Sequence, residues 1–418
     1  MSSYNIAFFA DVHAGYEYGT KTDALGVNLR VRDGYDAYHA IVSDIIAHRD
    51  QVDAVAVGGD AFHVSHPDIR TICNIQHGFR ELWRAGLTSD ILAGNHDATD
   101  DRSYPAAVAV LDDPDRGIFA HYKPYVKRNL TDGIVLHSLS HHGLHADDAP
   151  VLLPENGALN IFMAHGAAVD PNNMGLMRCM DSPREQIIGP DIIMSEDFVL
   201  RMLGHFHSRV PVGDAALNTW YAGSALRRGF SDAEGARGWT LFKIHEDGRV
   251  EVEHHDIPQR PQFDLQVIDA ASMTAASITE LIIHQLEATR EDEKDGEFNP
   301  MRAPILRQRV INIPTSTREG LDRFAISQNA RHSLTWMLEL IKPERVEQEM
   351  IVGVDGDEAS EYNYDNAPTI GGHGNMIDVV ESYKGWVPTS STANALADDV
   401  REVVTERASE HLRGAVNS

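Results

Sequence analysis

The fold is decided by the stretch Ala54-Val55-Ala56-Val57-Gly58-Gly59, which is followed at once by Asp60-Ala61-Phe62-His63. A short apolar run that ends in glycine is typical of a buried β-strand. In open α/β sheets, functional sites form beyond the carboxyl ends of the strands. The stretch therefore predicts a buried strand over 54–59 that carries Asp60 and His63 to a functional edge.

Four other apolar runs end in the same way. They predict strands over 5–10, 90–93, 160–164 and 199–204, and the segments after them are Asp11-Val12-His13, Gly94-Asn95-His96-Asp97, His165-Gly166 and His205-Phe206-His207. Because alternate residues of an extended segment point the same way, both members of each D-x-H or H-x-H pair can face one pocket. Glycines at 59, 94 and 204 let the backbone turn tightly beside a ligand.

Helical patterns alternate with these strands. Helices are predicted over 35–47 and over 68–85, and a closing hairpin is predicted around Glu246-Asp247-Gly248. Alternation of short buried strands with helices is the signature of an α/β layer fold. We therefore expect such a fold over about residues 1–258.

The residue types at the strand ends are those of a metal centre. Carboxylates and imidazoles together suit manganese, iron or zinc better than calcium. Two divalent metals about 3.5–4 Å apart can clamp a phosphodiester and activate a water for in-line attack. One ligand must then bridge the two metals, and the two carboxylate oxygens of Asp60 make it the natural choice.

The five segments, in this order, resemble the calcineurin-like metallophosphoesterase superfamily. Within it, the sequence is most similar to the SbcD branch, the bacterial relative of the meiotic-recombination-eleven nuclease. The closer resemblance rests on His63 after Asp60, on the step Ala164-His165-Gly166, and on Tyr221-Ala222-Gly223-Ser224 followed by Arg227, Phe230 and Gly238-Trp239-Thr240-Leu241. It covers about residues 5–258 well and 259–353 in outline.

The resemblance implies an α/β fold, namely a four-layer αββα metallophosphoesterase sandwich with a small α+β capping domain and a C-terminal helical tail. It implies two divalent metals, Mn²⁺ by preference, with Mg²⁺, Fe²⁺ or Zn²⁺ as alternatives. One metal would be held by Asp11, His13, Asp60 and His207, and the other by Asp60, Asn95, His165 and His205. His96 would protonate the leaving oxygen, Asp97 would orient His96 by accepting its other N–H, and His63 would position the phosphate.

Three domains are predicted: a nuclease domain over 1–258, a capping domain over 259–353 and a tail over 354–418. The capping domain should contain strands over 263–268, 305–313 and 345–352 and helices over 278–289 and 318–341. The tail should end in an amphipathic helix, with Leu396, Val400, Val403, Val404 and Leu412 on one side. A helix of this kind either docks on a partner or packs on its own domain.

The 418-residue chain carries a formal net charge of −27. This charge argues against binding nucleic acid by bulk electrostatics, although bound metals and local arginines can reverse the field at a site. Candidate arginines are Arg302, Arg307, Arg309, Arg318, Arg323 and Arg331, which either line a phosphate-backbone surface or pair with nearby acids. No stretch approaches the roughly 18 apolar residues of a membrane span. Cys73 and Cys179 either form one disulfide or, more simply, are reduced thiols in a cytoplasmic protein.

These features favour a metal-dependent DNA exonuclease with some endonuclease activity. By resemblance it would be a homodimer that works with an SbcC-like coiled-coil ATPase in DNA repair, recombination and replication. One alternative is a stand-alone metallophosphoesterase acting on nucleotides or phosphoproteins, and another is a scaffold that kept the fold without catalysis. The segment 141–155 has no counterpart in the family pattern, and His141, His142 and His145 form either an extra metal site or a solvated loop.

Overall fold

The computed structural model describes residues 3–99, 104–144, 150–168, 186–213, 217–230, 232, 235–290 and 303–342. Met1–Arg345 forms one compact unit and Val346–Ser418 a second. The second unit lies outside the described residues, and so do the predicted strand over 345–352 and the predicted C-terminal helix. The domain limits at 258 and 353 remain predictions.

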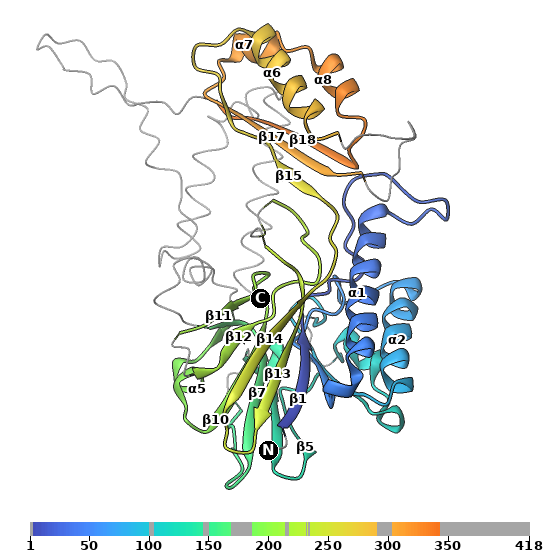
Figure 1. Ribbon diagram of the computed structural model, residues 1–418, viewed down its shortest axis with the longest axis vertical. Coiled ribbons are helices and arrows are strands. Elements are labelled where there is room, and N and C mark those ends of the chain that lie inside the picture. The colour runs from blue at the N-terminus through green and yellow to red at the C-terminus, as the bar shows by residue number, and fades with distance from the viewer. Residues whose placement is uncertain are drawn as a thin grey trace, which may run out of the picture. The chain divides into compact units, whose positions relative to one another are not determined.

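Two six-stranded sheets organise the first part of the described chain (Figure 1). The first has the order β14-β13-β1-β2-β3-β4, and its strands are β1 Ser3–Phe9, β2 Ala54–Val57, β3 Thr88–Leu92, β4 Ile118–His121, β13 Gly238–His245 and β14 Val250–Asp256. Strands β1 to β4 run parallel, whereas β13 and β14 form an antiparallel hairpin beside β1. Three of the predicted strands and the predicted hairpin are therefore confirmed in this sheet.

The second sheet has the order β11-β12-β10-β7-β6-β5. Its strands are β5 Tyr125–Thr131, β6 Ile134–Leu139, β7 Leu159–His165, β10 Phe198–Gly204, β11 Val210–Pro211 and β12 Thr219–Tyr221. Strands β6, β7, β10 and β12 are parallel, and the edge strands β5 and β11 are antiparallel to their neighbours. The remaining two predicted strands are β7 and β10.

An apolar layer lies between the two sheets. Ile6 and Phe8 of β1 belong to one buried cluster with Met163 of β7. Because side chains alternate along a strand, Ala7 and Phe9 point to the other face and join a second cluster under the helices. Strand β1 thus has apolar residues on both faces, as a strand in the middle of a sandwich requires.

Helices α1 (Leu29–Ala47) and α2 (Ile69–Arg84) lie side by side over the outer face of the first sheet (Figure 1). Each begins at a side-chain cap, because the oxygens of Asn28 and Asp68 accept backbone N–H bonds from Arg30 and Thr71. Helix α2 begins where the sequence predicts, but α1 begins at Leu29, earlier than the predicted residue 35. The buried Arg30 interrupts the apolar pattern of that first turn, so the pattern misses it.

Shorter elements complete the outer face of the second sheet. Ile193 of α5 (Pro190–Met194) packs in one buried cluster with Phe162 and Leu203. Other short elements are α3 His141–Leu144, β8 Ala167–Ala168 and β9 Ile187–Ile188. The connections of the first sheet contain 3-10 turns at Arg49–Gln51, Ala107–Leu111 and Pro114–Arg116. The layers are helix, sheet, sheet, helix, which confirms the expected αββα fold. Among the described residues, no helix combines the length and apolar character that crossing a bilayer requires.

A third sheet, of four strands, follows the linker. Its elements are β15 Gln262–Asp264, β16 Ile268–Asp269, α6 Ala275–Glu287, β17 Ile305–Ile311, α7 Thr315–Glu319, α8 Arg323–Asn329 and β18 Thr335–Leu340. β15, β16 and β18 all pair in parallel with β17. Ile278 and Ile282 of α6 pack with Leu306 and Val310 of β17 in a core of their own.

The predicted helix over 318–341 is wrong. Gly320 follows the last residue of α7, α8 ends at Asn329, and residues 335–340 form strand β18. Trp336, Leu338 and Leu340 alternate along that strand and pack on the third core. Their period of two, rather than 3.6, is what the helix interpretation overlooked.

A buried ionic group joins α1 to the linker before the third sheet. Both oxygens of Asp33 accept bonds from the guanidinium of Arg260, at 2.6 Å each. Arg30 donates to the same carboxylate at 2.6 Å and, through its other nitrogen, to the carbonyl oxygens of Arg227 and Arg228. The Asp33 carboxylate thus lies between two guanidinium groups, and the carbonyl oxygens of Arg227 and Arg228 accept from the second arm of Arg30.

Candidate metal centre

The carboxyl ends of strands from both sheets meet at one place. Strands β1, β2 and β3 are parallel neighbours in the first sheet, and β7 and β10 are parallel neighbours in the second. The backbone N–H of Asp11 donates to Gly59, and the N–H of His13 donates to Asp60. The N–H of His205, from the second sheet, donates to both carboxylate oxygens of Asp11 at 3.2 and 3.0 Å. The predicted site residues therefore converge across two sheets.

Asp60 lies between two imidazoles. Its Oδ2 is 3.6 Å from Nε2 of His13 and 3.4 Å from Nε2 of His165. Its Oδ1 accepts the backbone N–H of His96 at 2.8 Å. The Asp60 side chain is buried, and it is placed as a bridging carboxylate would be.

One end of the cluster joins Asp11 to two histidines. Nε2 of His13 is 3.8 Å from Asp11 Oδ1, and Nε2 of His207 is 3.9 Å from the same oxygen. The two Nε2 atoms are 3.2 Å apart. A ligand atom from each of the three residues lies within 4.8 Å of the other two, as in a site that could hold a metal ion.

The other end joins Asp60 to an amide and two histidines. Oδ1 of Asn95 is 3.0 Å from Nε2 of His165 and 3.3 Å from Nδ1 of His205. Asp11, Asp60 and His165 form a second group whose ligand atoms all lie within 4.8 Å of one another. The structure thus brings all seven predicted ligands to one place. The two groups of ligand atoms share Asp11, whereas the sets implied by the resemblance share Asp60, so the assignment of ligands to each metal remains a prediction.

The backbone at these residues is unusual. Asp11, His13, Asp60 and His205 have φ values of 51°, 47°, 50° and 104°, in the left-handed region that residues with a Cβ rarely adopt. Such conformations cost about 1–3 kcal/mol each and cluster at functional sites. Four of the seven predicted ligands carry this strain, which is evidence for a functional site that does not depend on any family resemblance.

Two predicted glycines are required by close approach. A Cβ at Gly94 would lie 2.2 Å from Oδ1 of Asp60, and a Cβ at Gly59 would lie 2.3 Å from Nδ1 of His165. Gly59 also has a φ of 100°. Any side chain at either position would displace a predicted ligand.

Hydrogen bonds fix the tautomers of two histidines. Because a carbonyl oxygen only accepts, Nδ1–H of His165 must donate to Gly58 at 2.8 Å, so Nε2 is the nitrogen that faces the cluster. His207 likewise donates from Nδ1 to Asp232 Oδ1 at 3.0 Å. These outer partners orient both Nε2 atoms toward a metal, although His165 must first lose its Nε2 proton and His207 its contact with Arg228. The donor set fits a pair of divalent cations.

The pKa values of Asp60 and His165 also indicate a site for positive charge. Burial opposes ionisation of Asp60, but the neighbouring His165 and His13 hold the pKa of its carboxyl well below the usual range. For His165, burial lowers the pKa, yet the carboxylates of Asp60 and Asp11 raise it to about 10. Without a metal, the cluster therefore retains a proton where a cation is needed.

The expected pairing of Asp97 with His96 is wrong. The buried carboxylate of Asp97 accepts backbone N–H bonds from Gly94 and Phe62 at 2.9 Å each and from Ala61 at 3.3 Å. Nδ1 of His96 instead lies 2.8 Å from the carbonyl oxygen of His63. Since three N–H donors already occupy Asp97, it holds the turns after β2 and β3 together, and the backbone of His63 orients His96.

His63 lies in the site and does not cap a helix, since Asp68 caps α2. Its ring stacks on the ring of His96, with centroids 5.0 Å apart, and its Nδ1 is 3.4 Å from Nδ1 of His13. Burial and the charges of His96 and Arg228 lower its pKa to about 4. His63 is therefore a neutral ring near neutral pH, suited to hydrogen bonding with a substrate.

Two residues at the site were not predicted from the sequence. Asp232 bonds His207 as described above and also accepts the backbone N–H of Arg228 at 2.8 Å. Nη2 of Arg228 lies 3.0 Å from Nε2 and 3.1 Å from Nδ1 of His207, and its guanidinium lies over the ring of Tyr16. The only sequence signal is their position beside Arg227 and Phe230 of the family pattern: Arg228 lies between them and Asp232 two residues after Phe230.

Other candidates from the sequence lie outside the site. Arg307 and Arg309 both pair with Asp264, the ordinary ion pairing that was the alternative for them. His142 bonds the carbonyl oxygen of Thr99. Further candidates lie outside the described residues: His145, the acids beside it, Cys179 and Arg302.

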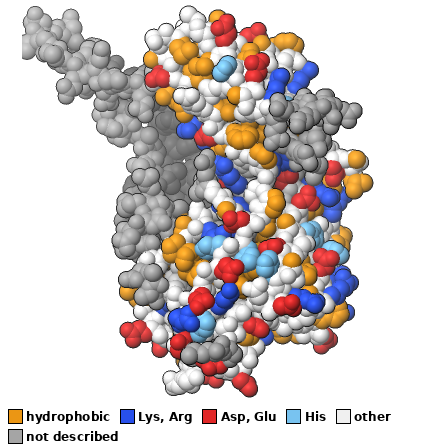
Figure 2. All heavy atoms as spheres, viewed as in Figure 1, with side chains coloured by type: hydrophobic (Ala, Val, Ile, Leu, Met, Phe, Trp, Pro, Cys, Tyr) orange, Lys and Arg blue, Asp and Glu red, His pale blue; other side chains and the backbone are white. Residues whose placement is uncertain are grey.

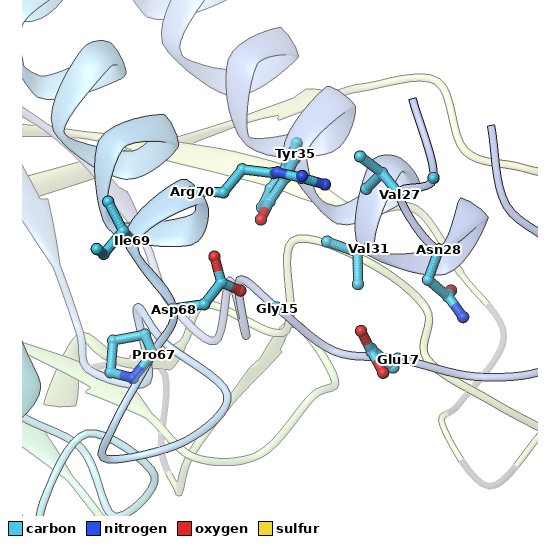
Figure 3. A pocket seen from close by; sticks show the side chains of 11 residues that line it. Gly15, Glu17, Val27, Asn28, Val31, Tyr35, Pro67, Asp68, Ile69 and Arg70 are labelled. Atoms are coloured by element: carbon cyan, nitrogen blue, oxygen red, sulfur yellow. The ribbon is translucent and has the colours of Figure 1, made fainter. Parts of the chain in front are cut away.

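A cavity of about 550 Å³ lies between the start of α2, the start of α1 and the loop after His13 (Figure 3). Glu17, Asp68 and Arg70 contribute its charged groups, and in Figure 3 the Arg70 side chain reaches toward Tyr35. With two carboxylates and one guanidinium, the lining suits a neutral or cationic group better than a phosphate. The cavity is therefore not the reaction centre.

No family model matches the sequence, and no curated protein matches it. Among solved structures, a dimetal phosphatase from Danio rerio is 12% identical, with 59% of this chain and 94% of that chain covered and a TM-score of 0.36. A purple acid phosphatase from yellow lupin (Lupinus luteus) is 13% identical, covering 61% and 53%, with a TM-score of 0.36. Vps29 from Entamoeba histolytica, complexed with Zn²⁺, is 10% identical, covering 60% and 98%, with a TM-score of 0.29. Likenesses this weak lend no support to a particular activity, which has to be argued from the site.

Proposed function

We propose that this chain is a two-metal phosphoesterase that hydrolyses phosphodiesters, with DNA as its substrate. The observation that carries the proposal is the convergence of Asp11, Asp60 and His165 with His13 and His207 in two overlapping groups of ligand atoms. Two divalent cations bound there would polarise the phosphoryl oxygens and lower the pKa of a water. Mn²⁺ remains the metal we expect by resemblance.

The chain's own residues supply the rest of the chemistry. His96 is half-buried, and its Nδ1–H donates to the carbonyl of His63, so its Nε2 is the nitrogen that can exchange a proton with the substrate. In the proposed mechanism this nitrogen would protonate the leaving oxygen as a general acid. The neutral ring of His63, stacked on His96, would hold the phosphate from the same side.

Arg228 would bind the anionic substrate. Its guanidinium lies beside His207 in a chain of net charge −27, so it supplies positive charge where a phosphate must arrive. Guanidinium groups suit phosphate oxygens because their donors form a planar fork. Tyr16 and Asp232 hold Arg228 in place, the first under its guanidinium and the second at its backbone.

A DNA substrate is supported by the motifs that resemble the SbcD branch. The same resemblance supports a homodimer and an SbcC-like ATPase partner. The tail over 354–418 would contact that ATPase. We keep these assignments as part of the proposal, together with a capping role for the third sheet. The loop of Arg228 contacts that part of the chain, because Arg307 of β17 lies over Phe230.

One observation favours a second candidate, a stand-alone phosphoesterase for nucleotides or phosphoproteins. Figure 2 shows basic and acidic side chains interspersed over the coloured part of the face in view, without a continuous basic stripe. A nuclease that follows a DNA backbone would be expected to carry such a stripe. The two candidates share the same centre and differ only in substrate.

The test is a nuclease assay on linear duplex DNA with Mn²⁺, alongside a small phosphodiester and a nucleoside monophosphate. We expect DNA hydrolysis that is at least about 100-fold slower in His96→Ala, with metal content unchanged, because general acid–base catalysis contributes that much. His77→Ala, at an exposed histidine of α2, is the matched control. Hydrolysis of the small substrates alone would select the second candidate, and equal rates in His96→Ala and wild type would remove His96 from the mechanism.

A further inference from the structure

A separate group of metal-ligand residues lies where α1 meets the edge of the first sheet. Asp44 is on the last turns of α1, His48 follows its last residue, and His255 is on the edge strand β14. A ligand atom from each lies within 4.8 Å of the other two, and the group shares no residue with the centre described above. The rings of His48 and His255 have their centroids 4.6 Å apart at 69°.

The side chains of this group are held in place by outer partners. Nδ1–H of His48 donates to the backbone carbonyl of Asp44 at 2.8 Å, which leaves a lone pair on the other nitrogen of that ring. Nε1–H of Trp239 donates to Oδ2 of Asp44 at 2.8 Å. The ring of His255 stacks flat on Trp239, with centroids 4.0 Å apart at 10°. Such contacts are the ones that orient the ligands of metal sites.

The two nitrogens of the His255 ring face different groups. Its Nε2 is buried and has no hydrogen-bond partner. Nε2 is 3.4 Å from Oε1 of Glu253, and the other oxygen of Glu253 accepts a bond from Lys243 at 2.8 Å. The other ring nitrogen, Nδ1, faces Asp44 and is 3.7 Å from its Oδ2. Nδ1 is therefore the nitrogen of His255 that can bind an ion together with Asp44.

We propose that Asp44, His48 and His255 bind an additional divalent transition-metal ion of the Zn²⁺ type. Two imidazoles with one or two carboxylates are ligands that Zn²⁺ takes in proteins. Asp44, Glu253 and Lys243 give the group a net charge of −1 when both rings are neutral, which favours a cation. The ion would tie the end of α1 to the edge strand β14. This inference does not depend on the proposed function.

The experiment counts Zn²⁺ bound per chain in the full-length protein, by elemental analysis after removal of excess metal. We expect His255→Ala and His48→Ala each to bind one Zn²⁺ fewer than wild type, or to bind that ion at least about tenfold more weakly, since loss of even an outer partner costs about 10–100-fold. The matched control is His254→Ala. It removes the neighbouring histidine of β14, whose Nδ1 pairs with Thr240 and not with the group.

The difference between variants, not the total, decides the result. If both variants bind as many Zn²⁺ ions as wild type and with the same affinity, the proposal is wrong, whether or not the centre of Asp11 and Asp60 binds metal. The melting temperature should also rise with Zn²⁺ more in His254→Ala than in His255→Ala. If the alanine variants do not fold, Asp44→Asn serves instead, because its amide oxygen can still accept the Trp239 N–H while the charge is lost. Wild-type Zn²⁺ affinity in that variant would equally overturn the proposal.

Discussion

Replacing Asp97 with alanine should lower the free energy of unfolding. It should have little effect on the rate of hydrolysis by molecules that remain folded. The Asp97 carboxylate accepts three backbone N–H bonds and is fully buried, so alanine would leave three buried donors without partners. Each such donor costs about 1–3 kcal/mol, and the 3.3 Å bond to Ala61 is the weakest of the three. The total should be about 3–6 kcal/mol, a large fraction of the 5–15 kcal/mol that typically holds a protein folded.

The assay is urea unfolding of metal-free protein, followed by circular dichroism and by thermal melting. We expect Asp97→Ala to lower the midpoint of both transitions, and the melting temperature by at least about 6 °C, at about 2 °C for each kcal/mol in a large domain. Asp97→Asn should cost less, because its amide oxygen can still accept and because burial and the charge of Asp60 raise the pKa of Asp97 to about 7. Asp36→Ala, at a half-exposed carboxylate of α1, is the control.

The reasoning would be refuted by one combination of results. If Asp97→Ala unfolds at the same urea concentration as wild type but hydrolyses substrate much more slowly, Asp97 acts on His96 after all. In that case the three backbone bonds contribute little, and the family's expected carboxylate–imidazole pair forms in solution.

Three further predictions concern the centre. Arg228→Gln should weaken the inhibition of substrate hydrolysis by inorganic phosphate about tenfold or more while the metal content stays constant, because a charge-assisted hydrogen bond contributes about 1.5–3 kcal/mol. Unchanged inhibition would place Arg228 outside the substrate site. Metal binding should release protons, because His165, with its pKa raised to about 10 by Asp60 and Asp11 against the effect of burial, must lose a proton to ligate; calorimetry in buffers of different ionisation enthalpy measures this, and a heat independent of buffer would contradict it. Gly94→Ala should abolish metal binding, since its Cβ would lie 2.2 Å from Oδ1 of Asp60. Elemental analysis of the folded variant measures this, and a wild-type metal content would contradict the prediction.

The strands that carry the site could be predicted because their signal is local. A short apolar run followed by a ligand-type residue, as in β2 and Asp60, needs no knowledge of the rest of the chain. The same holds for Gly94, whose role is to leave room. The convergence itself could be expected only through the rule on strand ends and the family resemblance, and the structure shows it as distances between Asp60, His13 and His165.

The contacts that the sequence did not reveal are all tertiary. Arg228 and Asp232 lie in a loop without periodicity, and their approach to His207 depends on where that loop packs. The partner of Asp97 was assigned by analogy, but its hydrogen bonds go to backbone groups, which sequence patterns do not describe. Strand β6 has a local signal, the apolar run Ile134–Leu139 after Asp132-Gly133, but it is not among the predicted strands.

The Asp33 carboxylate gives the linker and the loop of Arg228 a shared anchor. Arg260 holds it with both guanidinium arms, and Arg30 spans from the same carboxylate to the carbonyl of Arg227. A rotation of the linker would break the bidentate ion pair between Arg260 and Asp33. Any displacement of Arg30 that followed would also move the backbone beside Arg228, because Arg30 donates to the carbonyl oxygens there. A rotation of the third sheet that broke these bonds would therefore also alter the position of Arg228, the residue proposed to bind phosphate.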